Sequence, residues 1–310
     1  GWPLAYLNER LETAGAVPVT GDQQNLRKSL SAAFETAWDR LPPKLQDTFR
    51  ALTLFKDGPS CGTPALAEPL DLDDSEAHAR LRRLLDLSLL ADAGDERWSL
   101  HPLLCGFAAA CDAVDPAAHL RWARHYEGVA RTADRLCLQG GEDILHGLAL
   151  FDMEWPHIRA GQAWAAKHAG DNDDAARLCS DYPDAAAYCL SLRLHPRQSI
   201  AWLEAAALAA RRLDEKGSEG AHLGNLGLAY ADLGQVREAI DYHQQALAIS
   251  QQIGDRRGEG ADLANLGLAY KTLGDTTRAR EFWTQALTIF EAIQDPNAEK
   301  VRRWLAQLDK

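Results

Sequence analysis

The feature that most constrains this chain is an internal repeat near its C-terminal end. The segment from Asn225 to Tyr230 recurs unchanged from Asn265 to Tyr270, as Asn-Leu-Gly-Leu-Ala-Tyr. Further identities at the same spacing pair Gly234, Ala239, Ala246, Leu247 and Ile249 with Gly274, Ala279, Ala286, Leu287 and Ile289. A fixed period of about 40 residues predicts a stack of helical hairpins, because a single hairpin cannot bury its own apolar face. Such a stack either presents a groove to a partner or serves purely as a scaffold.

Length and composition limit the classes to which the chain can belong. At 310 residues it exceeds the usual size of one hydrophobic core, so two domains are expected. The net charge of −12 argues against sequence-independent nucleic-acid binding, which needs clustered Lys and Arg. No apolar run approaches the ~20 residues that span a bilayer, and no secretory signal opens the chain. The six cysteines form no C-x-x-C pair, so we expect reduced structural thiols in a cytoplasmic protein and no zinc site.

The N-terminal third shows helical periodicity followed by a hairpin pattern. Helices are expected over 26–41 and 45–55, each ended by a Pro-containing segment. A third is expected to begin with Asp74 or Ser75 as its N-cap. After it, a turn containing Gly94 separates two short apolar runs, which is typical of a β-hairpin. Helices followed by a hairpin describe a winged helix-turn-helix domain.

From residue 116 onward the periodicity is helical throughout. Helices are expected near 117–136, 141–152, 156–169, 173–191, 198–214, 221–233, 236–253, 261–273, 277–294 and 297–309. The last opens with Asp295 as N-cap and Pro296 at N1, and it is expected to seal the apolar end of the stack. Shifting the repeat back by one further period predicts a third, degenerate repeat over 181–220, with Ala185 in place of the Asn.

The repeat units resemble tetratricopeptide repeats (TPRs), specifically the long type found in kinesin light chain and cell-polarity adaptors. The resemblance rests on small residues where two helices approach closely and on a consensus aromatic residue: Gly227, Ala239, Ala246, Tyr230 and Tyr270. In several peptide-binding members an Asn five positions before that Tyr contacts the backbone of the partner, and Asn225 and Asn265 occupy this position. An Asn side chain can donate and accept at once, so it can pair with a peptide unit in either sense. Lys271 would add a contact for an acidic side chain; the alternative is that both Asn residues only cap or bridge neighbouring helices.

Residues 26–112 resemble the winged-helix domain of signal-transduction ATPases with numerous domains (STAND), including the NB-ARC class. The resemblance runs through Leu30–Phe34, Leu41-Pro42, Phe49–Leu52, Leu84–Leu90 and Trp98–Leu104. In that family a Met-His-Asp-like motif follows the hairpin, and its His contacts the β-phosphate of bound ADP. His101 stands in this place, although Leu100 replaces the Met and Pro102 replaces the Asp, a departure common in bacterial members.

Two shorter segments resemble the same family. Gly1-Trp2-Pro3-Leu4-Ala5 matches the Gly-x-Pro-Leu-Ala motif of the helical domain before the winged helix, where the Pro packs against adenine. Residues 154–160 resemble the entry into the repeats of bacterial members. The resemblance implies that Pro3 and His101 contact ADP or ATP with Mg²⁺ in an intact parent protein, and that this chain starts in the middle of it.

The predicted fold is therefore mainly α: a winged-helix domain followed by an α-solenoid of TPR-like helical hairpins. We expect the end of a helical domain and a linker over 1–25, the winged helix over 26–115, a helical linker with degenerate repeats over 116–180, and TPR repeats with a capping helix over 181–310. The chain has no G-x-x-x-x-G-K-[ST] motif and none of the common hydrolase or zinc motifs, so we expect no catalytic residue and no cofactor of its own.

Two functions fit these patterns. The first is the regulatory part of a STAND NTPase switch, in which the winged helix controls a nucleotide-binding module and the repeats bind a protein or peptide partner. The second is a transcription regulator whose winged helix binds DNA. Residues 27–112 contain ten Lys or Arg against fourteen Asp or Glu, and a reader of the major groove needs a broader basic face. The acidic balance favours the switch.

Overall fold

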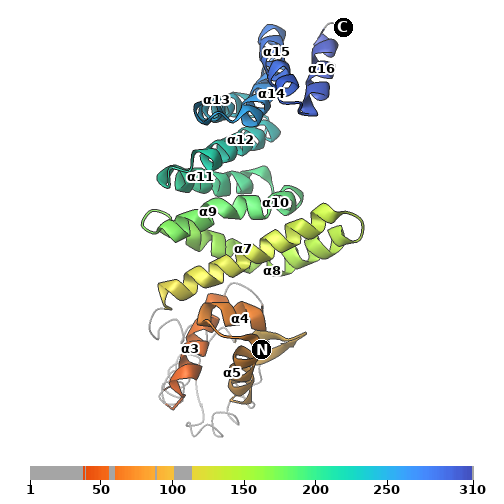
Figure 1. Ribbon diagram of the computed structural model, residues 1–310. Helices are drawn as coiled ribbons and strands as arrows, with labels where there is room; N and C mark the ends of the chain where they lie inside the picture. The colour runs from red at the N-terminus through yellow and green to blue at the C-terminus, as the bar shows by residue number, and fades with distance from the viewer. Residues whose placement is uncertain (1–37, 39, 56–59, 88, 101–113, 309–310) are drawn as a thin grey trace, which may run out of the picture. The chain divides into compact units, whose positions relative to one another are not determined.

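The computed structural model describes residues 38, 40–55, 60–87, 89–100 and 114–308, and these are mainly helical (Figure 1). They form two compact units. The first holds the described residues up to Tyr126 together with Glu154–Gly161; the second holds Glu127–Met153 and the described residues from Gln162 onward. Helices α7 (Pro116–Gln139) and α8 (Asp143–His168) contribute to both units.

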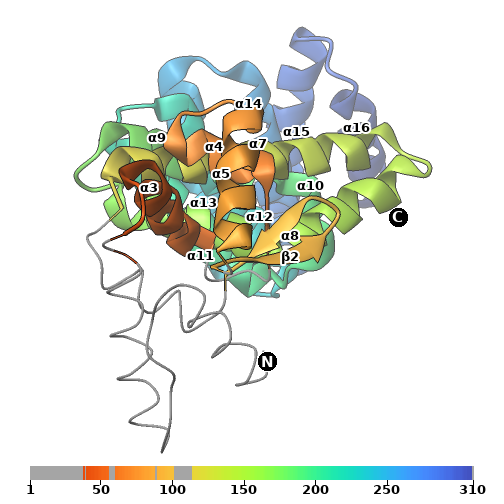
Figure 2. The same cartoon turned by 90° about the horizontal axis from the view of Figure 1, so that it is seen from below.

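The first unit combines short helices with a small antiparallel sheet (Figure 2). Its elements follow in the order α3 (Pro43–Ala51), the 3₁₀ helix η1 (Leu52–Phe55), β1 (Cys61–Gly62), α4 (Thr63–Leu70), α5 (Asp74–Asp86), β2 (Ala91–Gly94) and β3 (Arg97–Ser99). Strand β3 lies between the other two, and its Trp98 pairs with Cys61 of β1 and Asp92 of β2. The indole Nε1 of Trp98 donates to the Thr63 hydroxyl at 3.0 Å, which satisfies the polar atom of this buried ring. The predicted hairpin is confirmed.

Helix α4 and strand β1 were not predicted from the sequence. Pro64 stands in the first turn of α4 and Pro69 in its last, so the segment resembles a Pro-rich loop. Pro64 is tolerated because a first-turn amide has no helical partner to lose. The side chain of Leu66 is fully buried, and this burial stabilises a helix that intrinsic propensity alone does not favour.

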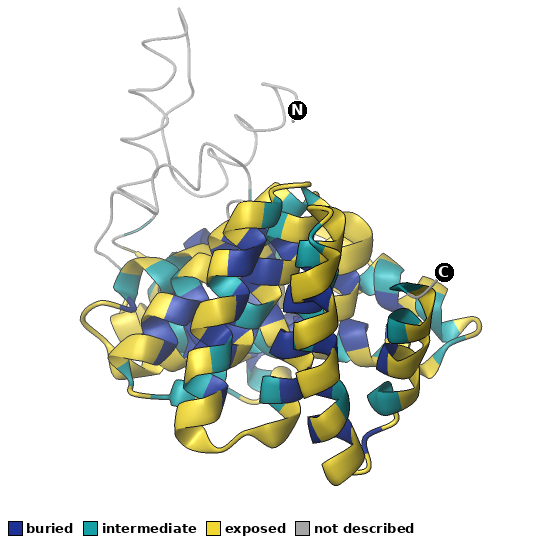
Figure 3. Ribbon diagram, turned by 90° about the horizontal axis from the view of Figure 1, so that it is seen from above, coloured by how far each residue is buried: buried dark blue, intermediate teal, exposed yellow. Residues whose placement is uncertain are grey.

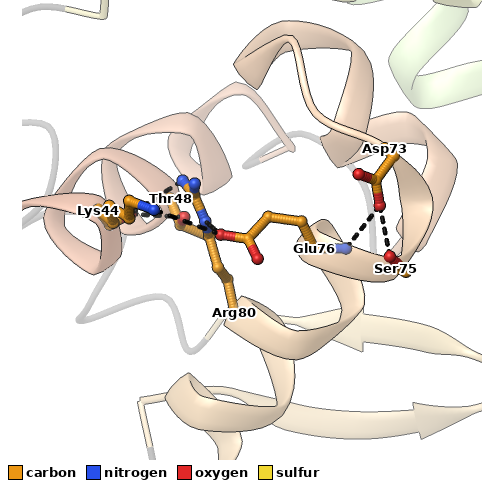
Figure 4. Close-up of polar contacts among 6 residues, drawn as sticks. All are labelled: Lys44, Thr48, Asp73, Ser75, Glu76 and Arg80. Atoms are coloured by element: carbon orange, nitrogen blue, oxygen red, sulfur yellow. Dashed lines mark hydrogen bonds and ion pairs between the residues drawn. The ribbon is translucent and has the colours of Figure 1, made fainter.

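The N-cap of α5 is Asp73, so the prediction of Asp74 or Ser75 was wrong by one or two positions. Asp73 has an extended backbone, with ψ at 157°, and its Oδ1 accepts the backbone N–H of Glu76 at 2.9 Å and the Ser75 hydroxyl at 2.5 Å (Figure 4). Asp74 is already helical and cannot fill the cap position. The hydrogen bonds from Ser75 and Glu76 lower the pKa of Asp73.

The second unit is a stack of helices that follow one another in chain order (Figure 1). After α7 and α8 come α9 (Asp173–Ala185), α10 (Ala187–Arg193), α11 (Pro196–Arg212), α12 (Lys216–Asp232), α13 (Val236–Ile253), α14 (Arg256–Thr272), α15 (Thr276–Ala292) and α16 (Asn297–Leu308). Helices α11, α13 and α15 start at positions 196, 236 and 276, and α12 and α14 start at 216 and 256, so the starts keep the period of the sequence. The predicted stack of helical hairpins is confirmed.

Two predicted helix boundaries in this region were wrong. Helix α8 runs without a break through Pro156, although a break was expected there. The proline removes the bond to the carbonyl of Asp152, and this residue is exposed, so water can satisfy the carbonyl. Conversely, the helix expected over 173–191 breaks at Ala186, where φ is −129°. The break is stabilised by the buried Asp134, whose Oδ1 accepts the first free amides of α10, at 2.7 and 2.9 Å.

The turns between helices recur at regular intervals along the chain. At each turn from α11 to α16 one residue has a positive φ of 55–82°, and these residues are Asp214, Gly234, Gly254, Gly274 and Gln294. This left-handed conformation ends a helix by redirecting the chain, and glycine adopts it with least strain. The regular turns explain why the helices keep the period that the sequence shows.

The hairpins bury apolar stripes between helices and leave polar stripes outside (Figure 3). Ala239, Ala246, Ala279 and Ala286 are fully buried, as the small-residue pattern predicted. The last helix, α16, buries Val301, and its Trp304 packs on Trp283 with ring centroids 5.4 Å apart. The predicted capping helix is confirmed, because α16 completes the last apolar cluster of the stack.

Candidate partner-binding face of the repeats

Asn225 and Asn265 occupy equivalent positions on the first helices of the two strong repeats, α12 and α14. The side chain of Asn225 is exposed and that of Asn265 is half-buried. Each is followed by a buried Leu, Leu226 at 1% and Leu266 at 0% exposure, so each Asn borders the buried side of its helix. Neither side-chain amide makes a hydrogen bond with the described residues. Within that part of the chain, the two Asn side chains therefore do not bridge neighbouring helices by hydrogen bonds.

An apolar row runs beside the Asn residues. Tyr188 of α10, Leu228 of α12 and Leu268 of α14 are separated by one repeat period each and occupy the same repeat position. Tyr188 is 37% exposed and Leu228 46%, while Leu268 is half-buried. Sequence reasoning did not single out this row, although the same period that identified the Asn residues also marks it. Ile253 and Leu273 are exposed at helix ends, whereas Leu208 of α11 and Met153 of α8 are exposed within their helices.

Lys271 lies on α14, one turn beyond this row, and is exposed. Its Nζ sits 5.8 Å from the centroid of the Trp283 ring, a weak cation–π contact that leaves the ammonium group hydrated. Earlier in the stack, α9 exposes Asp181 and Asp184. The stack therefore carries carboxylates at α9 and an ammonium group at α14. Pro3 and His101, the predicted nucleotide contacts, lie outside the described residues.

Stacked aromatic rings hold the first helix of each repeat against its second helix. Tyr230 stacks on Tyr242 with centroids 5.1 Å apart and planes 12° from parallel; Tyr270 stacks on Phe282 at 5.4 Å and 8°. Tyr230 also packs against the apolar cluster that α11 contributes, and its hydroxyl donates to Glu204 at 3.4 Å. The consensus tyrosines thus pack between units, as their position predicted, and they fix the rotation of the helices that carry the Asn residues.

Buried polar groups lie directly beneath this face, between α12, α13 and α14. His243 is 1%, Ser250 6% and Asp262 7% exposed. The Nδ1 atom of His243 lies 3.5 Å from Asp262 Oδ1, and the Ser250 hydroxyl donates to Asp262 Oδ2 at a long 3.3 Å. Burial raises the pKa of Asp262, and the neighbouring His243 and Ser250 oppose that shift. The sequence analysis missed this cluster, because nothing in the local pattern brings residues 243 and 262 together.

A second buried polar pair joins the preceding helices. The Oγ atom of Ser180 on α9 lies 2.9 Å from Nε2 of His222 on α12, and both side chains are buried. Burial lowers the pKa of His222, so the ring is held neutral in the stack. A serine and a histidine at this distance resemble a nucleophile–base pair, but both are sealed from solvent. The pair is a structural contact between helices.

Three arginines of α5, at positions 80, 82 and 83, bear on nucleic-acid binding by the first unit. Each of them contacts a neighbouring side chain. Arg80 Nε donates to Glu76 at 2.9 Å (Figure 4), Arg82 Nε donates to His78 at 3.3 Å, and Arg83 lies 3.9 Å from Asp86. Carboxylates beside two of the three cations weaken their attraction for phosphate.

An ion pair in the first unit ties β3 to the middle of α8. The Nη1 atom of Arg97 donates to Glu154 Oε1 at 2.5 Å, while Nε and Nη2 donate to the hydroxyl and carbonyl of Ser60 at 2.8 and 2.9 Å. His157 adds a contact of 3.0 Å from Nε2 to the same carbonyl. Glu154 and His157 come from the segment that resembles the entry into the repeats, and here they hold that segment against the sheet.

The described thiols are buried and free: Cys61, Cys137, Cys179 and Cys189. Burial raises the pKa of Cys61 and of Cys179 to about 12, so neither is a nucleophile at neutral pH. In the part of the chain that the structure describes, no three His, Cys, Asp or Glu side chains gather closely enough to hold a metal ion. Within the same ranges, no helix is both long and apolar enough to cross a membrane.

The repeat region matches a known family. The family model described as "Tetratricopeptide repeat" matches residues 218–292, which comprise α12–α15 except for the first two positions of α12. The chain is also similar to two curated proteins named "Regulatory protein AfsR". It is 36% identical to that of Streptomyces griseus over 93 residues and to that of Streptomyces coelicolor over 91. These matches cover 30% and 29% of the chain and 9% of each relative, so the chain spans about a tenth of the length of the proteins it resembles.

Three solved structures are similar to this chain, and two of them are described as containing tetratricopeptide or TPR-like repeats. One is a STAND protein with a tetratricopeptide repeat sensor from Pyrococcus horikoshii, at 14% identity and a TM-score of 0.37, covering 96% of this chain and 57% of that one. Another is a kinesin light chain with nearly identical TPR-like repeats from Podospora anserina, at 18% and 0.42, covering 61% and 86%. A third is BtubC from P. vanneervenii, at 18% and 0.38, covering 94% and 91%.

Proposed function

We propose that this chain is the regulatory, partner-sensing part of a longer STAND-type NTPase switch. Its tetratricopeptide repeats bind an extended segment of a protein partner, and its first unit is a winged helix that controls a nucleotide-binding module elsewhere in the parent. The similarity to regulatory proteins of streptomycetes supports a regulatory role, although it covers only about a tenth of their length.

The exposed, unbonded amide of Asn225 is the observation that carries partner binding. A side-chain amide that braced neighbouring helices would be held by internal hydrogen bonds, and this one has none among the described residues. Asn265 repeats the arrangement one unit later, beside the apolar row at Leu228 and Leu268. Two amides in register can pair with backbone groups of one extended segment, while the row accepts its apolar side chains.

The topology of the first unit supports the winged-helix assignment. The order α3, β1, α4, α5, β2, β3, with a sheet ordered β1-β3-β2, is consistent with helices followed by a hairpin wing. The neutralised arginines of α5 favour a regulatory domain over a DNA-binding one. In the parent, His101 would contact the β-phosphate of ADP and Pro3 the adenine, and the missing module would supply the Mg²⁺ site and the hydrolytic chemistry.

The first experiment tests partner binding. Peptides selected from a random display library on the wild-type chain are measured by fluorescence anisotropy against Asn225→Ala/Asn265→Ala. The loss of two hydrogen-bonding amides should weaken binding by about 2 kcal/mol, or roughly thirtyfold. Gln245→Ala/Gln285→Ala is the matched control, because these exposed amides also stand one repeat period apart but on the second helices α13 and α15. Equal affinity for both double variants would contradict the assignment of the face.

The second experiment tests the switch. In the full-length parent, His101→Ala should speed ADP release and favour the active state, because a contact made only in the closed state sets the equilibrium. The isolated chain should show no tight nucleotide binding by calorimetry. Unchanged ADP release in the parent, together with nanomolar binding of the chain to a specific duplex at physiological salt, would favour the DNA-binding alternative.

A further inference from the structure

The second helices of the three hairpins differ at one buried position. Leu203 of α11, His243 of α13 and Trp283 of α15 occupy the same place in successive repeats, and each is buried. A first-helix glycine faces this position in both strong repeats. A Cβ on Gly227 would lie 2.6 Å from Nε2 of His243, and a Cβ on Gly267 would overlap the ring of Trp283. The first-helix backbone thus approaches both rings closely, but the Trp283 ring is mainly apolar whereas the His243 ring is polar.

The His243 seam, which we define as His243, Ser250 and Asp262, is incompletely satisfied. The Nδ1 atom of His243 makes no hydrogen bond with the described residues, and its nearest polar contact is Asp262 Oδ1 at 3.5 Å. Asp262 accepts one long hydrogen bond from Ser250. Gly224 of α12 faces its Oδ1 atom without a side chain, and a Cβ added at Gly224 would lie 3.4 Å from that oxygen. A buried carboxylate with a half-satisfied network weakens the packing between helices.

The corresponding seam of the next repeat is fully satisfied. Trp283 is completely buried, and its Nε1 donates to the carbonyl of Ala264 at 3.0 Å. Phe290 stands where Ser250 stands in the previous repeat and is 2% exposed. This seam joins α14 to α15 and α16 through one continuous apolar cluster. The two neighbouring seams therefore differ in how far their buried polar atoms are satisfied, although the first helices of both repeats carry the same six-residue motif.

The His243 seam lies between the two helices that carry the proposed partner contacts. Gly227, which faces His243, is two positions beyond Asn225 on α12. Asp262 is three positions before Asn265 on α14, less than one turn away. A segment bound to both Asn residues would bridge α12 and α14 across this seam, so the separation of the two helices determines whether both contacts can form.

We propose that the His243 seam is a conformational joint in the repeat array and that the bound segment closes it. The inference rests on the proposed partner-binding face and adds its regulation: the array opens at the seam without a partner and is held closed when Asn225 and Asn265 are both engaged. Binding and closure are then linked, because a ligand that contacts both sides of a joint stabilises its closed state.

Native-state hydrogen exchange of the whole 310-residue chain tests the joint without any partner. In a helical stack with uniform interfaces, amides near the end exchange fastest, because terminal repeats fray. The joint predicts the reverse: buried amides of α13 and the start of α14 exchange at least about tenfold faster than those of α15. Exchange in α13 as slow as in α15, or slower, would overturn the proposal.

A double variant that replaces the polar groups of the seam gives a second test of the joint. His243→Leu with Asp262→Asn introduces the residue of position 203 and removes the buried charge, and it should slow exchange in α13 about tenfold. A selected peptide should slow α13 exchange in the wild type and leave the variant unchanged. If every selected peptide binds Asn225→Ala/Asn265→Ala as tightly as wild type, the proposed partner-binding face is wrong. The hydrogen-exchange pattern of the free chain still tests the joint in that case. If peptides bind through the Asn residues but exchange in α13 stays the same, only the joint fails.

Discussion

The repeats spanning α12–α13 and α14–α15 share an identical six-residue motif but are stabilised differently. In the first, the close approach at Gly227 is made by His243, a buried ring with an unsatisfied nitrogen. In the second, the approach at Gly267 is made by Trp283, which is fully buried and hydrogen-bonded. The difference shows that two repeats with the same first-helix motif can be stabilised differently by residues outside that motif, such as His243, Asp262 and Trp283.

The largest expected difference concerns the two rings. Trp283→Ala should lower the free energy of unfolding by about 3–5 kcal/mol, because it opens a cavity in an apolar cluster. His243→Ala should cost roughly 1–2 kcal/mol, since it removes a polar ring that is poorly satisfied and leaves Asp262 buried. Chemical denaturation monitored by circular dichroism compares them. An equal loss of unfolding free energy in the two variants would mean that both interfaces stabilise the fold equally, which would contradict the comparison.

The next effect concerns the glycines. Gly227→Ala and Gly267→Ala each force a methyl group against a ring, at a typical cost of about 1–3 kcal/mol. The cost should be larger at 267, because the indole of Trp283 is anchored by its hydrogen bond and by the apolar cluster around it. Thermal melts of the two variants report the order. A larger loss at 227 would show that the His243 ring is the more tightly held.

Asp262 gives a pH-dependent prediction. Burial raises its folded-state pKa above the unfolded value near 3.8, so the folded state binds more protons between these two pKa values. The contribution of this group to stability is therefore present below pH 3.8 and is lost as the pH rises through the folded pKa. Asp262→Asn should be more stable than wild type at pH 7 and should lose that advantage in acid. Urea unfolding at several pH values tests this; an advantage that grows in acid has the wrong sign.

The smallest expected effect is at the surface. Asn225→Ala with Asn265→Ala should change the free energy of unfolding by less than about 0.5 kcal/mol, because neither amide is bonded internally among the described residues. If the residues were braces, each lost bond would cost about 1 kcal/mol or more and the melting temperature would fall. A melting curve beside the peptide-binding measurement separates the two accounts.

The repeat architecture could be predicted from the sequence because its signals are local and periodic. The fixed repeat spacing and the small residues at 227, 239 and 246 directly determine helix–helix approach. Helix α4 was missed because Pro64 and Pro69 resemble loop signals, and the continuity of α8 was missed because Pro156 resembles a break. In both cases tertiary packing or solvation compensates for a local signal.

The candidate site divides in the same way. The equivalent positions of Asn225 and Asn265 on α12 and α14 could be predicted from their spacing, since residues one period apart repeat their place in the unit. Their role in binding a partner stays a prediction. The His243 seam could not be predicted, because the contact between His243 and Asp262 depends on the packing of separate helices. The nucleotide contacts proposed for Pro3 and His101 remain predictions from resemblance.

The central claim is that a partner segment binds along the first helices, at Asn225 and Asn265. The side-chain amide resonances of Asn225, Asn265, Gln245 and Gln285 can be assigned by comparing ¹⁵N spectra of the single Ala variants with wild type. Addition of a selected peptide should shift the resonances of Asn225 and Asn265 and leave those of Gln245 and Gln285 in place. Shifts confined to Gln245 and Gln285 would place the partner on the second helices and contradict the account.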